Sequence, residues 1–205
     1  MILKTFIIFN LMLIFSYVFY RNLADKYRLR IKDKTLQKHI FDISDLILYG
    51  SIFYLLVFTN PSALPFDIYY AITFIISLAI FGFVLQIPGV DKTVPNIKSW
   101  NKNKFIAIIL TIIFTIILGK DIFVLNKRNI LIYLNSLIIL ILACFLSYNK
   151  NKFKTFHPHH WQIFLLVSII IIPNNNKTKF LSAMYLSFFA HGIIAHSAAS
   201  LIKNE

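Results

Sequence analysis

Histidine and aspartate side chains beside apolar segments are the residues of this chain best suited to chemistry. Five of the six histidines lie in the last fifty residues, and the sixth, His39, precedes Asp42 and Asp45. Imidazole and carboxylate groups are common ligands of zinc and iron. A metal site is therefore one hypothesis, with zinc or iron as the cofactor. Its candidate ligands are His39, Asp42, Asp45, His159, His160 and His196.

The same groups also have structural interpretations. The histidines that precede Trp161 could form the interfacial head of a helix, with Pro158 in its first turn. Asp42 and Asp45 could cap the helix expected to begin near residue 39, because carboxylates are stabilised at the positive end of a helix dipole. In that case no cofactor is expected.

Two further chemical hypotheses concern the deeper histidines. A proton or ion pathway could follow the Asp/His groups, since ionisable side chains inside a membrane usually face the bundle interior. Haem held between two histidines is less favoured, because His191 has no histidine at matched depth on another segment. His191 and His196 could instead hydrogen-bond a neighbouring helix.

The composition places the chain among membrane proteins. Hydrophobic residues make up 58% and charged residues only 14%, whereas a soluble domain carries about a quarter charged residues. The apolar residues arrive in blocks separated by Lys/Asn-rich breaks. We predict an all-α polytopic transmembrane helix bundle, one integral membrane domain over residues 1–205, with seven spans, or six if block 159–173 is re-entrant. The expected spans are 2–20, 39–59, 67–88, 105–119, 130–148, 159–173 and 180–202.

The net charge of +13 is explained by orientation in a bilayer. The most basic break is the segment 21–38, which we expect on the cytoplasmic side. With seven spans, fifteen of the 21 Lys/Arg residues fall on that side, with the N-terminus outside and the C-terminus cytoplasmic. We therefore expect the lipid bilayer and other membrane proteins as partners, and no nucleic acid.

This topology predicts that polar groups gather at the cytoplasmic end. His39 and the histidines before Trp161 should lie at that interface, with Asp42 about one turn deeper than His39. His196 should lie roughly 9 Å from the inner end of the last helix, and His191 near mid-membrane. Because these last two are five residues apart, they should point about 140° apart around their helix, which disfavours a shared metal ion.

One stretch resembles a known group of proteins. The run His157-Pro158-His159-His160-Trp161-Gln162-Ile163-Phe164, followed by His191-Gly192-Ile193-Ile194-Ala195-His196, resembles small uncharacterised multi-pass membrane proteins of large DNA viruses of protists. The resemblance covers residues 156–200 only. It implies no activity, so no catalytic residue follows from it, and it would place a viral chain in a host membrane.

The leading functional expectation is a multi-pass membrane protein that acts through membrane residence or partner binding. The alternative is a His/Asp metal-dependent enzyme that acts on a lipid or other apolar substrate from the cytoplasmic face. A proton or ion channel, or a small transporter, is third.

Overall fold

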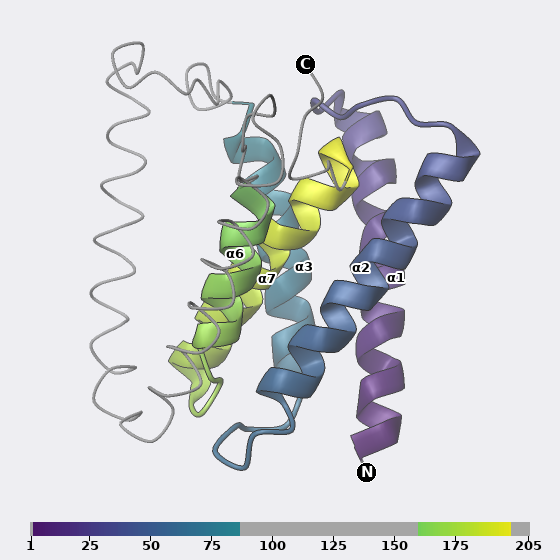
Figure 1. Ribbon diagram of the computed structural model, residues 1–205. Coiled ribbons are helices and arrows are strands. Elements are labelled where there is room, and N and C mark those ends of the chain that lie inside the picture. The colour runs from purple at the N-terminus through teal and green to yellow at the C-terminus, as the bar shows by residue number, and fades with distance from the viewer. Residues whose placement is uncertain (1, 87–159, 198–205) are drawn as a thin grey trace, which may run out of the picture.

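The computed structural model describes residues 2–86 and 160–197. These residues form five helices and contain no strand, which confirms the predicted all-helical class for this part of the chain. The seven-span count is not supported, and the expected spans 105–119 and 130–148 lie outside the described residues. The helices are α1 (Ile2–Tyr27), α2 (Leu36–Val57), α3 (Ile68–Val84), α6 (His160–Ile170) and α7 (Asn176–His196) (Figure 1).

Two of the helices have the dimensions of membrane spans. α1 has 26 residues and α2 has 22, and both are apolar enough to cross a membrane. α3 is apolar but has 17 residues. α6 has only 11 residues, so the segment predicted as a span over 159–173 is shorter than the ~20 residues of a straight crossing.

Local capping explains where the helices depart from the predicted boundaries. α1 continues seven residues past residue 20 and ends where Arg28 adopts a positive φ of 53°. The next amide, on Leu29, then donates to the carbonyl of Ala24 at 2.8 Å, which is a Schellman-type ending. α2 is capped by Thr35, whose side chain accepts from the Lys38 amide, so the prediction that Asp42 and Asp45 cap it was wrong.

The last helix also begins and ends differently from expectation. Asn175 and Thr178 form a capping box, so α7 begins at Asn176 rather than at 180. It ends at His196, because Ser197 has a φ of 69°. His196 is thus the terminal residue of the described helix, not a residue about 9 Å inside it.

α7 is the central helix of the described bundle. It contacts α6, α3, α1 and α2, and fifteen of its 21 residues are buried. α1, α3 and α7 run in one direction, and α2 and α6 run in the other (Figure 1). The Leu64 amide donates to the Pro173 carbonyl at 2.7 Å and joins the loops at one end of the bundle. The Lys32 amide donates to the Ala195 carbonyl at 2.9 Å at the other end.

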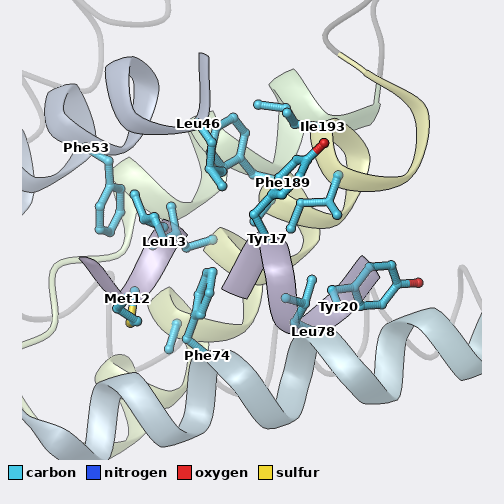
Figure 2. Close-up of a cluster of buried hydrophobic side chains, with 14 of the residues drawn as sticks. Met12, Leu13, Tyr17, Tyr20, Leu46, Phe53, Phe74, Leu78, Phe189 and Ile193 are labelled. Atoms are coloured by element: carbon cyan, nitrogen blue, oxygen red, sulfur yellow. The ribbon is translucent and has the colours of Figure 1, made fainter. Parts of the chain in front are cut away.

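The core between these helices is rich in aromatic and large aliphatic side chains. Figure 2 shows Met12, Leu13, Tyr17 and Tyr20 of α1 facing side chains of α2, α3 and α7. Two glycines allow the close approach: a Cβ on Gly50 would overlap the end of the Leu13 side chain, and one on Gly82 would overlap the Tyr20 ring. α1 is therefore seated against α2 at one glycine and against α3 at the other.

Candidate functional site

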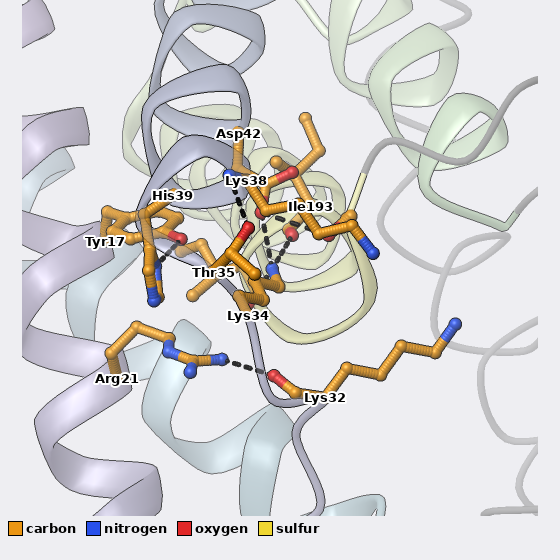
Figure 3. A network of polar contacts seen from close by, with 11 residues as sticks. Tyr17, Arg21, Lys32, Lys34, Thr35, Lys38, His39, Asp42 and Ile193 are labelled. Atoms are coloured by element: carbon orange, nitrogen blue, oxygen red, sulfur yellow. Dashed lines mark hydrogen bonds and ion pairs between the residues drawn. The ribbon is translucent and has the colours of Figure 1, made fainter.

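A buried ion pair stands where the α1–α2 connection meets the end of α7. Lys34 Nζ lies 2.6 Å from Asp42 Oδ2, and the two side chains are 0% and 4% exposed (Figure 3). The same ammonium donates to the carbonyls of Ile193 at 3.0 Å and Ile194 at 2.7 Å. The last carbonyls of a helix have no partner within it, and a cation is stabilised at the negative end of its dipole. Lys34 therefore closes the C-terminus of α7.

Neighbouring residues complete this closure. The Lys32 amide donates to the Ala195 carbonyl, so three successive carbonyls of α7 accept hydrogen bonds from the segment 32–34. The Ser197 hydroxyl donates to Asp42 Oδ2 at 3.1 Å. Arg21 Nη1 donates to the Lys32 carbonyl at 2.9 Å and fixes the connection against α1. The arrangement joins α1, α2 and α7 through one carboxylate and one ammonium.

Burial sets the electrostatics of Lys34. Desolvation lowers the pKa of its ammonium from the ordinary value of 10.5, and this effect outweighs the hydrogen bond from Lys34 to Asp42, which raises the pKa. The nearby charges of Arg21 and Lys32 lower the pKa further. The bundle thus keeps a charged lysine inside at a cost in free energy, and the hydrogen bonds to carboxylate and carbonyls offset that cost.

His39 is engaged by α1 rather than by Asp42. Its Nδ1 lies 2.6 Å from the Tyr17 hydroxyl, and the two rings meet edge to face with centroids 5.8 Å apart. The Tyr17 ring also lies 5.9 Å from Lys34 Nζ, within cation–π range. In Figure 3 His39 and Asp42 are labelled on successive turns of α2, with Tyr17 beside His39 and Lys34 below Asp42.

His191 forms a second tyrosine–histidine pair, deeper in the bundle. Its Nε2 lies 2.9 Å from the Tyr20 hydroxyl, and both residues are buried. The Phe81 ring meets the imidazole edge to face at a centroid distance of 5.0 Å. The rings of His191 and His196 are 6.1 Å apart, so they are closer than the expected 140° separation around the helix suggested.

The predicted metal ligands therefore bind different partners and do not converge on one point in the described part of the chain. Among the described residues, no three His, Cys, Asp or Glu side chains are grouped so as to hold a metal ion. Asp42 binds Lys34 and Ser197, His39 binds Tyr17, and Asp45 is partly buried one turn after Asp42. The zinc or iron hypothesis stays a prediction.

The remaining histidines of the set fall in α6 or before it. His159 lies outside the described residues, and for His160 the description covers the backbone alone, as the first residue of α6. The Phe164 ring meets Phe188 edge to face and lies tilted beside Tyr185, both of the antiparallel α7, so one turn earlier the chain reaches the level of about residue 191. His160 thus shares a level with His191 more closely than with His196, whereas we expected it at the cytoplasmic interface, well away from His191.

Three residues that bind the predicted ones were not identified from the sequence: Lys34, Tyr17 and Tyr20. Lys34 counted only as one cation of a basic segment, and Tyr17 and Tyr20 only as part of an apolar block. Lys34 directly precedes Thr35, the N-cap of α2, so the sequence places the Lys34 side chain near the start of that helix. Nothing in its spacing indicates partners 159 and 160 residues away.

A second ion pair lies at the opposite end of the bundle. Lys179 of α7 pairs with Asp67, and its side chain is 5% exposed. Asp67 is also the N-cap of α3 and accepts from the Tyr70 amide at 3.0 Å. The Tyr70 hydroxyl reaches Ser182 of α7 at 3.1 Å. α7 is therefore held by a lysine–aspartate pair near each of its ends.

No family model matches the chain, and no curated protein or solved structure matches it. The resemblance of residues 156–200 to viral multi-pass proteins accordingly stays a prediction.

Proposed function

We propose that the protein is a multi-pass integral membrane protein that acts through membrane residence and partner binding. The observation that carries this proposal is an outward-facing apolar band on α1, α2 and α3. Exposed large apolar side chains run over residues 2–18, 36–56 and 68–84, about 25 to 30 Å along each helix. That height approaches the ~30 Å hydrocarbon core of a bilayer.

The arrangement of polar groups supports the same proposal. Pairs such as Tyr70 with Ser182 and Tyr20 with His191 lie inside the bundle, while isoleucine, leucine and phenylalanine face outward. Interhelical hydrogen bonds with an apolar exterior are typical of helices that pack in lipid. A water-soluble bundle would reverse this distribution, since large exposed apolar surfaces are rare on soluble monomers.

The distribution of charge favours one orientation. We call the end that holds the α1–α2 connection and the C-terminus of α7 the basic end. In the described part of the chain, the exposed cations of this end are Lys26, Arg28, Arg30, Lys32 and Lys38. The opposite end holds the exposed Lys4 and Lys177 and the buried Lys179. By the positive-inside rule the basic end is cytoplasmic and the N-terminus lies outside, and a seven-span chain would then have its C-terminus in the cytoplasm.

Cysteine labelling in native membranes tests membrane residence and orientation together. In a Cys144→Ser background, Ser62→Cys reports the opposite end and Asp33→Cys the basic end. We expect the chain to stay in membranes after alkaline carbonate washing. An impermeant maleimide should label position 62 from outside and position 33 only after permeabilisation. Release by carbonate would refute membrane residence, and labelling of both positions from one side would refute the orientation.

A metal-dependent membrane enzyme that acts on a lipid or other apolar substrate is the second candidate. The observation that favours it is the proximity of the His191 and His196 rings at the level reached by the start of α6. Metal analysis of detergent-purified protein should then find stoichiometric zinc or iron that is lost in His160→Ala or His196→Ala. Metal-free protein, together with normal folding of both variants, would end this candidate.

A further inference from the structure

In the connection between α1 and α2, successive side chains alternate between the bundle and the solvent. Leu29 is buried and Ile31 packs against the core, while their chain neighbours Arg28, Arg30 and Lys32 are exposed. This alternation is typical of an extended chain lying on a surface. The cations of the segment therefore face away from the bundle, whereas the apolar side chains anchor it.

Main-chain hydrogen bonds hold this segment in place. The Leu29 amide binds the Ala24 carbonyl, the Lys32 amide binds the Ala195 carbonyl, and Arg21 binds the Lys32 carbonyl. Lys34 then turns inward to Asp42, and Figure 3 shows the Lys32 side chain pointing away from it. Because these bonds hold the backbone, binding of a ligand by these cations would order their side chains without a further cost in backbone entropy.

The segment also lies at the right depth for lipid headgroups. The exposed apolar side chains of α1 end at Val18, two turns before Lys26, and those of α2 begin at Leu36, so the cations of residues 26–38 lie at the border of the apolar band. Tyr27 is 53% exposed at this edge, where amphipathic aromatic rings commonly meet the headgroup layer. Lys26 lies over the Tyr27 ring at 5.5 Å.

The local charge is strongly positive. Five exposed cations stand on residues 26–38, against the exposed carboxylates Asp25 and Asp33 in the same region. Clusters of four to eight Lys/Arg residues directly next to a membrane span attract anionic lipids. Arginine adds bidentate hydrogen bonding to phosphate oxygens.

We infer that residues 26–38 form a preformed binding surface for anionic phospholipid headgroups, on the membrane face that holds the basic end. This inference rests on the proposed membrane residence and adds a lipid class as partner. A nucleic acid would meet the same positive charges, but the surface stands at the edge of an apolar band where lipid phosphates are already concentrated.

Lipid retention by the full-length protein tests the surface. The purified chain in detergent is titrated with phosphatidylglycerol or phosphatidylcholine, and bound lipid is counted by native mass spectrometry. The wild type should prefer phosphatidylglycerol, and Arg30→Gln/Lys32→Gln should weaken that binding by roughly 25-fold, since each cation contributes about fivefold near an anionic surface. The Lys32 amide bond to α7 stays in this variant, because it comes from the backbone.

The matched control removes two exposed cations at the opposite end, Lys4→Gln/Lys177→Gln. This control should keep wild-type lipid preference. Equal binding of both lipids by the wild type, or an equal loss in the control, would overturn the inference. So would a short DNA duplex that binds more tightly than phosphatidylglycerol and depends on Arg30 and Lys32. Carbonate extraction of the same variants separates this failure from a failure of membrane residence.

Discussion

Lys34 and Asp42 form an ion pair at 2.6 Å in which the lysine also binds two terminal carbonyls of α7. One ammonium therefore satisfies a carboxylate from α2 and the end of a helix that is distant in sequence. Removal of either partner would leave a buried charge without its counterion.

Breaking the Lys34–Asp42 pair should strongly destabilise the bundle. Lys34→Met leaves the buried Asp42 carboxylate without its counterion and removes the ammonium that binds the Ile194 carbonyl, so we expect a loss of roughly 3–5 kcal/mol in the free energy of unfolding. Asp42→Leu should cost less, because the carbonyls still bind Lys34. Reversible unfolding in mixed micelles, followed by circular dichroism, measures both losses and the coupling in the double variant.

Lys32→Met is the matched control for this cycle. Its side chain is exposed and its contact with α7 comes from the backbone amide, so the change should lie within about 0.5 kcal/mol. Additive effects of Lys34→Met and Asp42→Leu would show that the pair is not coupled.

Stability should rise with pH in the alkaline range through Lys34. Burial lowers the pKa of Lys34 in the folded state, so between that pKa and the ordinary value of 10.5 in the unfolded chain, the unfolded chain binds more protons. The cost of the buried charge is present below this window and fades as pH rises through it. The difference in unfolding free energy between wild type and Lys34→Met isolates this effect from other titrating groups. A difference that shrinks with rising pH would contradict the sign.

Gly82→Ala should destabilise the protein although alanine favours helix. The new Cβ would overlap three atoms of the buried Tyr20 side chain, and overpacking of this kind costs about 1–3 kcal/mol. The helix propensity gain of about 1 kcal/mol offsets part of that cost. Thermal unfolding compares this variant with Gly50→Ala, whose Cβ would overlap only the flexible end of Leu13 and should be tolerated better. Equal tolerance at both sites would argue against a rigid Tyr20.

Two tyrosine variants compare how much each tyrosine–histidine hydrogen bond contributes to stability. Tyr20→Phe removes the partner of Nε2 on the buried His191 and should cost about 1–3 kcal/mol. Tyr17→Phe removes the partner of His39, which is only partly buried, and should cost less because water can replace the hydroxyl. Unfolding free energies of the two variants provide the comparison. A larger loss for Tyr17→Phe would contradict the expectation that the hydrogen bond of the more buried histidine, His191, contributes more.

The helical class and the approximate places of α2 and α3 could be predicted from the residues alone. Apolar blocks of span length predict the helices, and Asn60, Pro61 and Pro65 predict the break between them, because these signals act over a few neighbouring residues. The early start of α7 was also readable in principle, because Asn175 and Thr178 form a local capping box. The expected span 180–202 began too late because we assigned the asparagine-rich run before it to a break between apolar blocks.

The partners of the polar groups could not be predicted, because they depend on helices that meet only after folding. His39 and Asp42 looked like a ligand pair from their spacing, yet one binds Tyr17 and the other binds Lys34. The ammonium of Lys34 reaches carbonyls 159 and 160 residues away. Local sequence specifies where helices begin and how apolar they are. The choice of hydrogen-bond partner depends on which buried donors and acceptors packing brings together, and each of them must be satisfied there.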